Sequence, residues 1–257
     1  MNLILTGGIA SLAAGLASVV GAFPVYLPLK YIQRFQGALL GFGGGVMLAA
    51  TAFSLIVPGT EAALSQGASQ IYAASMMVCG VAVGAIFLKL THDLVPHEHF
   101  TKGKEGGNAD NLKRIWLFVI AITLHNFPEG MAVGVNFGSG NWTDAIPLTI
   151  GIALQNLPEG LVVALSLVTQ NYTASYAVGI SLLTGLVEPV GGLIGAAVVT
   201  VAQFLLPWAM AFAAGAMLFV ISDEIIPESH SQGREKEGTL GVMVGFAVMM
   251  FLDIGLG

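Results

Sequence analysis

The sequence predicts an all-α integral membrane protein with eight transmembrane helices in one domain spanning residues 1–257. Of the 257 residues, 55% are hydrophobic and only 9% are charged, whereas a soluble domain carries about 25% charged residues. The mean hydropathy is +0.82. A membrane-spanning helix needs about 20 largely apolar residues. Eight segments meet this need: 3–28, 36–58, 70–94, 112–137, 144–169, 173–200, 205–227 and 238–256.

The connections between these segments predict how the chain is oriented. All nine Lys and Arg residues lie in or beside the connections after the first, third and seventh segments. Because basic residues collect on the cytoplasmic side of a membrane, we expect both termini to face away from the cytosol. No Lys or Arg precedes the first segment, so we expect it to be retained rather than cleaved as a signal peptide. Residues 95–111, which contain histidines, have the composition of a flexible, solvated cytoplasmic loop.

A single cysteine, Cys79, excludes an internal disulfide framework and a cysteine-based zinc finger. It lies in an apolar run, and we expect it to be a small buried residue.

The fourth segment contains the polar stretch LHNFPEGMA, residues 124–132. In a helix, His125 and Glu129 are four residues apart and Asn126 and Glu129 are three apart, so all three share a face. Pro128 cannot donate a hydrogen bond to the carbonyl of Leu124, and we expect it to kink the helix there. A carbonyl freed within a membrane must face protein, water or an ion.

The fifth segment nearly repeats this stretch with LQNLPEGLV, residues 154–162. Gln155, Asn156 and Glu159 share a face for the same reason, and Pro158 has the position of the first motif's proline. Both motifs lie near the middle of their segments. We therefore expect them at similar depth on adjacent, antiparallel helices.

A third carboxylate, Glu188, is central in the sixth segment, within GLVEPVGG. Three carboxylates at this depth would repel one another, and their desolvation is costly. No Lys or Arg lies in the middle of any segment to pair with them. Protons could neutralise them, but divalent cations would do so better. Imidazole, carboxylate and amide groups form a mixed nitrogen and oxygen shell that suits zinc, similar first-row ions and cadmium.

An architectural interpretation competes with the metal site, because membrane helices also use single polar residues for interhelical hydrogen bonds. Taken singly, Asn126, Gln155 and Asn156 fit either interpretation. The combination of His125, Glu129, Glu159 and Glu188 favours a binding site.

With the paired motifs HNFPEG and QNLPEG, the sequence resembles the ZIP (Zrt/Irt-like) family of divalent metal transporters, in particular its bacterial GufA-type branch. The resemblance covers the whole chain. It implies a 3+2+3 bundle in which the first and last three helices are inverted repeats flanking helices 4 and 5, and it implies a homodimer in the bacterial cytoplasmic (inner) membrane. It also implies transport of Zn²⁺ into the cytosol by alternating access, with Cd²⁺, Fe²⁺ or Mn²⁺ as other substrates and no organic cofactor.

The resemblance further implies a metal centre with two adjacent sites. The primary site would consist of His125, Glu129, Gln155 and Glu159, with Met47 adding a thioether. Asn126, Asn156 and Glu188 would complete the second site, and Glu129 and Glu159 would bridge the two metals. Many members have histidine at the position of Gln155. An amide oxygen is a harder and weaker ligand than imidazole, so the metal preference stays open.

A transported ion also needs a path on either side of this centre. Glu61, Asp144 and Asp253 lie near the outer ends of segments, where they could attract cations; ordinary helix-end charges are the alternative for Glu61 and Asp144. Towards the cytosol, the stretches THDLVPHEHF and SDEIIPESH are rich in groups that bind metals weakly. The predicted exit residues are His92, Asp93, His97, His99, Asp223 and Glu224.

Two other functions compete with metal transport. An intramembrane metalloenzyme could use His125 and Glu129 to hold a metal that activates water, although the sequence contains no HExxH motif. A proton-coupled carrier of organic solutes could use the glutamates as a proton relay, but it leaves the histidines and Met47 without a common role. No Walker-type motif is present, so we do not expect direct drive by ATP.

Overall fold

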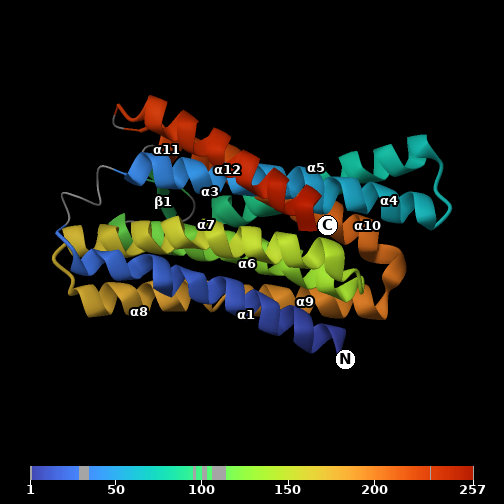
Figure 1. Cartoon of the computed structure of the whole chain (residues 1–257), viewed down its shortest axis with the longest axis horizontal. Coiled ribbons are helices and arrows are strands. Elements are labelled where there is room, and N and C mark those ends of the chain that lie inside the picture. Colours follow the sequence, from blue (N-terminus) through green and yellow to red (C-terminus); the bar gives the residue numbers. More distant parts are fainter. Residues whose placement is uncertain are drawn as a thin grey trace.

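The computed structural model describes residues 2–28, 35–94, 97–99, 103–105, 114–231 and 233–256. It is a bundle of long helices that run roughly side by side, with the two ends of the chain at the same end of the bundle (Figure 1). The helices are α1 (Leu3–Ala22), α3 (Gln36–Ala50), α4 (Val57–Ser65), α5 (Gln70–Leu94), α6 (Arg114–Gly138), α7 (Trp142–Thr169), α8 (Ala174–Gly185), α9 (Glu188–Val201), α10 (Leu206–Val220), α11 (Ile226–Ser229) and α12 (Glu235–Leu256).

Shorter elements complete the chain. Two 3-10 turns, η1 (Phe23–Tyr26) and η3 (Gln203–Leu205), flank helices, and two π-helical segments, η2 (Thr51–Ile56) and η4 (Ile221–Ile225), lie within long spans. Within the described residues, seven helical segments are long and apolar enough to cross a membrane. The 25-residue α6 runs among them. The predicted all-α membrane class is therefore confirmed.

The ends of the helices follow local sequence signals. The side chains of Asn2, Asn141 and Thr173 accept hydrogen bonds from backbone N–H groups at the starts of α1, α7 and α8, as helix N-caps do. The sixth span is broken between α8 and α9. Pro189 is the second residue of α9, where its missing N–H costs little because the first turn has no intrahelical acceptor.

Two expectations differ from the structure. The loop of residues 95–111 contains an antiparallel pair of short strands, β1 (His97–His99) and β2 (Gly103–Glu105). Their backbone register sets residue 98 opposite residue 104. Cys79 is exposed rather than buried, because α5 turns one face away from the bundle, where lipid takes the place of protein.

The arrangement of the helices has an internal two-fold symmetry. α12 packs along α3, and α10 packs along α5; likewise α9 packs along α6, and α1 packs along α7. The symmetry exchanges the first span with the sixth, the second with the seventh, the third with the eighth, and α6 with α7. Under this exchange, the pair α3–α12 becomes α10–α5, and the pair α6–α9 becomes α7–α1. α1 and α8–α9 run in opposite directions (Figure 1). The first and last three spans are therefore inverted repeats around α6 and α7.

The same symmetry holds at single residues where helices approach closely. A Cβ on Gly130 of α6 would overlap the carbonyl oxygen of Glu188, and a Cβ on Gly160 of α7 would overlap that of Ser18. Each glycine is the last residue of a PEG triplet. The hydroxyl of Ser11 donates to the Gly130 carbonyl at 3.2 Å, and that of Ser181 donates to the Gly160 carbonyl at 3.0 Å. Close helix contact therefore requires the glycine in both motifs.

The π segments are also related by this symmetry. η2 follows Met47 by four residues and η4 follows Met217 by four, and a proline stands two residues after each segment ends, at Pro58 and Pro227. Pro58 has no N–H to offer the carbonyl of Ser54 four residues earlier. The side-chain Nδ2 of Asn136 on α6 donates to that carbonyl at 3.4 Å.

We expect Gly160→Ala to destabilise the fold because its Cβ would meet the backbone of α1. Overpacking of this kind costs about 1–3 kcal/mol. Thermal unfolding of the purified protein in detergent measures the effect as a lowered Tm. Gly179→Ala on α8 is the matched control, because its Cβ would meet nothing within 4 Å. Equal Tm values for the two variants would contradict the close contact.

Candidate metal centre

The polar residues of the two motifs lie in the interior of the bundle. Each of the predicted ligands is at most 3% exposed, although nearly all are polar or charged. They come from four spans: Met47 on α3; His125, Asn126 and Glu129 on α6; Gln155, Asn156 and Glu159 on α7; and Glu188 at the start of α9.

Most of the polar atoms in this group have no hydrogen-bond partner. Both carboxylate oxygens of Glu129 and of Glu159 are unpartnered, and so are both side-chain polar atoms of Asn126 and Gln155. Buried polar groups are rarely left unpaired, because each lost partner costs about 1–3 kcal/mol. Their concentration here indicates a site that is built to hold a further polar species.

Glu188 is connected to the motifs through Asn156. The Nδ2 of Asn156 donates to Glu188 Oε1 at 2.6 Å and to the Ala14 carbonyl at 2.9 Å, while Glu188 Oε2 is unpartnered. Glu129, Glu159 and Glu188 lie close enough to repel one another. A divalent cation among the three would replace that repulsion with attraction and would use the unpartnered oxygens as ligands.

His125 has one nitrogen committed and one open. Its Nε2 lies 2.7 Å from Glu224 Oε1 on η4, and its Nδ1 has no hydrogen-bond partner. When Nε2–H donates to the carboxylate, the lone pair of Nδ1 is left to bind a metal. A carboxylate on the far nitrogen fixes the tautomer and raises the basicity of a histidine ligand.

The structure joins two predicted exit residues to this histidine. The rings of His92 and His125 stack with centroids 5.7 Å apart, and His92 Nδ1 lies 3.5 Å from Glu224 Oε1. Ligand atoms of the three side chains all lie within 4.8 Å of one another, and all three are buried. The imidazole and carboxylate groups are suited to a transition-metal ion, so this cluster extends the centre towards the predicted exit.

On the predicted outer side, Asp253 of α12 is also part of a polar cluster. Its Oδ1 accepts from the hydroxyl of Ser54 at 2.7 Å, and its Oδ2 is buried without a partner. Asn136, which donates to the Ser54 carbonyl, has an unpartnered Oδ1. Sequence reasoning missed Ser54 and Asn136. The signal that could have found Ser54 is Pro58, which leaves the Ser54 carbonyl without its helical donor.

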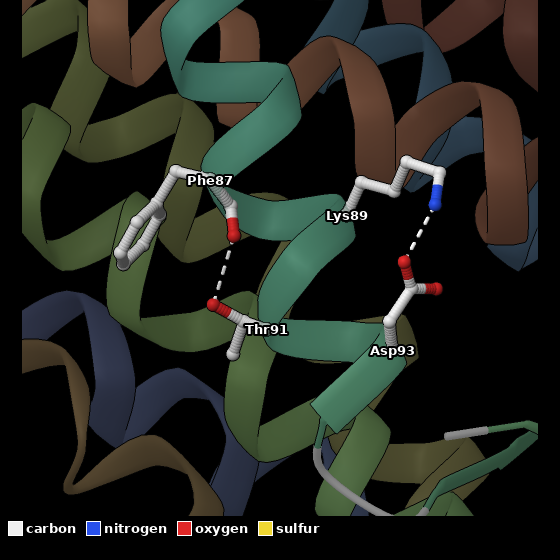
Figure 2. Close-up of polar contacts among 4 residues, drawn as sticks. All are labelled: Phe87, Lys89, Thr91 and Asp93. Carbon is white, nitrogen blue, oxygen red and sulfur yellow. Dashed lines mark hydrogen bonds and ion pairs between the residues drawn. The ribbon is translucent and has the colours of Figure 1, made fainter. Parts of the chain in front are cut away.

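Other predicted path residues lie apart from these clusters. Asp93 follows the buried His92 on α5 but is itself exposed. It pairs with Lys89 at 2.6 Å (Figure 2). Glu61 is exposed on α4. Asp144, in the first turn of α7, accepts a hydrogen bond from Asn141 at 2.8 Å.

The remaining predicted exit residues are Asp223, His97 and His99. Asp223 lies beside Glu224 on η4 and is partly buried. His97 and His99 belong to β1, but their side chains lie outside the described part of the chain. Their roles stay predictions.

Sequence comparison with known proteins identifies the same family. A sequence model of the family described as "ZIP Zinc transporter" matches residues 108–253. The chain belongs to the ZIP family. It is 46% identical over 251 residues, 98% of this chain and 99% of the relative, to the "Zinc transporter GufA" of Myxococcus xanthus.

Other relatives in this family extend from bacteria to animals. The "Zinc transporter ZIPB" of Bordetella bronchiseptica is 45% identical over 95% of this chain and 80% of the relative. The human "Zinc transporter ZIP11" is 33% identical over 93% of this chain and 94% of the relative. As a ZIP family member, the chain is a transporter and not an enzyme, which excludes the metalloenzyme alternative.

We expect Zn²⁺ to stabilise the purified ZIP protein and Glu129→Gln to remove most of that effect. A ligand at 100 times its dissociation constant stabilises a folded protein by about 2.7 kcal/mol. Thermal unfolding with Zn²⁺ and with a chelator measures the difference in Tm. Glu61→Gln, at an exposed carboxylate, is the control and should keep the wild-type difference. A Glu129→Gln variant that responds to Zn²⁺ as the wild type does would contradict this assignment.

Proposed function

We propose that the protein carries Zn²⁺ across the bacterial cytoplasmic membrane into the cytosol, with Cd²⁺, Fe²⁺ and Mn²⁺ as further substrates. One observation carries this proposal: three glutamates are buried together, with five unpartnered carboxylate oxygens among them. Hydrogen-bonded partners or basic side chains would be expected around a purely architectural cluster. The three relatives are each named as zinc transporters, and these names support zinc as the main substrate.

The ligand set supports a centre that holds two cations. His125, Gln155 and Met47 would bind one ion, while Asn126, Asn156 and Glu188 would bind the other. Glu129 and Glu159 would bridge the two, since each has both oxygens free. Two dications would offset the charge of three glutamates and leave a small positive excess that favours release.

The two polar clusters support a path through this centre. Asp253 and Ser54 would receive an ion from outside and replace part of its water shell with oxygen ligands. His125 belongs both to the centre and to the cluster with His92 and Glu224. An ion could therefore pass from the centre to that cluster by exchanging ligands around one shared histidine.

Alternating access fits this arrangement better than an open pore, because the ligands are closed off in the interior of the bundle. We propose that the spans carrying the motifs move relative to their neighbours to expose the centre to each side in turn. The distribution of the nine basic residues supports a cytosolic location for the connections after the first, third and seventh spans. Both termini would then face outward. We also propose a homodimer, which rests on the family resemblance alone.

Glu129→Ala and Glu159→Ala should each abolish metal uptake, because each removes both bridging oxygens. The measurement is flux into proteoliposomes that contain a zinc- or cadmium-sensitive dye. Folding of each variant is checked by size-exclusion chromatography. Glu237→Ala, at an exposed carboxylate in the first turn of α12, serves as the control and should retain uptake. Flux equal to the wild type in both motif variants would mean that HNFPEG and QNLPEG are architectural.

The orientation is testable with single cysteines in a Cys79→Ser background. Ser69→Cys, in the turn between α4 and α5, should react with a membrane-impermeant maleimide in intact cells. Gln170→Cys, in the turn between α7 and α8, should react only after the cells are permeabilised. Both positions are exposed. The reverse pattern would invert the proposed topology.

A further inference from the structure

An apolar pocket of about 310 Å³ lies between α5, α6, α9 and α10, away from the metal centre. Its volume is at the lower end of the range of about 300–1,000 Å³ that is typical of ligand sites. Among the described residues that line it, Trp208 alone carries a side-chain N–H or O–H group. The lining residues are Gly80, Val83, Met131, Val135, Ile194, Gly195, Val198, Leu205, Trp208, Ala209 and Phe212.

The pocket has a buried floor and a mouth that opens to the outside of the bundle. Val135 and Gly195 are buried at the floor, whereas Val83, Ile194 and Val198 are exposed at the rim. All of these residues belong to membrane-spanning helices, so the medium at the mouth is hydrocarbon. Water would find almost no hydrogen-bond partners in such a pocket. An acyl chain is therefore the occupant that this lining and this opening fit.

A second pocket, of about 600 Å³, meets the first at Trp208. It lies at the end of the bundle, where the turn between α4 and α5 approaches η3, and its lining mixes apolar residues with Gln66, Ser69 and Tyr72. The Nε2 of Gln66 donates to the Gln203 carbonyl at 3.0 Å and so ties that turn to η3. No Lys or Arg is among the residues that line this pocket.

We propose that the two pockets together bind one phospholipid, with an acyl chain in the apolar pocket and a zwitterionic headgroup in the mixed pocket. The pair has the polarity of a lipid: apolar within the span and polar at its end. Trp208 lies at the junction, and tryptophan favours this boundary because its ring is apolar and its N–H is polar. The lack of basic lining residues disfavours an anionic headgroup, which would attract Lys or Arg.

The internal symmetry allows the pocket to be compared with the corresponding place in the other half of the bundle. The positions related by symmetry to Gly195, Met131 and Val135 are Val25, Leu161 and Leu165. All three of these side chains are buried in one hydrophobic cluster. On that side of the bundle, protein side chains fill the corresponding space, and Val25 occupies the place where Gly195 has no side chain.

The bound chain would contact spans from both inverted repeats. α5 belongs to the first repeat, α9 and α10 belong to the second, and α6 is one of the two central helices. The lipid would therefore be a bridging component of the bundle. This site goes beyond the proposed transport and does not depend on a metal.

Photochemical labelling tests the site directly. The whole protein is placed in nanodiscs that contain phosphatidylcholine with a diazirine on one acyl chain, and the adducts are mapped by peptide mass spectrometry after illumination. We expect adducts on Val135, which bulk lipid cannot reach because it lines the pocket and is only 1% exposed. Adducts on Leu240 and Phe251, exposed on α12, report contact with bulk lipid.

Two variants place a larger side chain in the pocket from different helices. If one variant does not fold, the other still tests the site. Ala209→Leu and Val83→Trp should each reduce the deep adducts at least about fivefold and leave those on α12 unchanged. Val244→Trp, at the symmetry-related exposed position on α12, is the matched control and should change neither. Absence of deep adducts in the wild type, or equal yields in the filled variants, would overturn the proposal.

The headgroup is tested by substituting phosphatidylglycerol with the same diazirine chain. We expect phosphatidylglycerol to label Val135 no more strongly than phosphatidylcholine does, because no basic residue is among the described residues that line the mixed pocket. Stronger labelling by the anionic lipid would overturn the zwitterionic assignment. Because no metal is present in these measurements, their outcome is separate from that of the flux assay.

Discussion

The burial of three carboxylates in one apolar bundle is the constraint on which the rest of the structure depends. Glu129, Glu159 and Glu188 are buried, and no Lys or Arg lies in the middle of the spans that carry them. Such a group is costly to keep, and the helices around it must be held in place firmly enough to prevent water from entering. In the proposed transport, the unpartnered oxygens and amides would be the groups that bind a cation as it arrives.

The packing that holds these carboxylates uses the residue directly after two of them. Gly130 and Gly160 allow the turns that carry Glu129 and Glu159 to lie against the backbones of α9 and α1. The helix contact and the ligand are therefore neighbours in sequence, and a change in one acts on the other. The PEG triplet thus combines a structural and a chemical requirement in three residues.

Much of this could be predicted from sequence because membrane helices follow simple rules of length and polarity. Runs of apolar residues predicted the spans. The shared helix faces of the motifs predicted which polar side chains are buried together. The clusters formed by Ser54 with Asp253 and by His92 with Glu224 were not, because each joins spans that are far apart in the chain. Predicting such a pair requires knowing that α12 packs along α3 and η2, and that α5 packs along α10.

The inverted repeats were invisible in the sequence for a related reason. They are preserved in the positions of close contacts rather than in residue identity. Gly84 meets the carbonyl of Phe212, and Gly245 meets that of Phe42, yet the surrounding residues differ. The short strands β1 and β2 also escaped prediction, because three-residue strands carry too few side chains to produce a readable alternation.

The symmetry also relates the two polar clusters. Ser54 and Glu224 are each the fourth residue of a π segment, and His92 and Asp253 each follow a symmetry-related glycine by eight residues. The geometry of the two clusters is thus shared, but Ser54 and Asp253 offer only oxygen ligands, whereas His92 adds an imidazole. In the proposed transport, the related backbones would treat the two directions alike, and these four side chains would make the rates differ, with harder ligands on one side and softer ligands on the other.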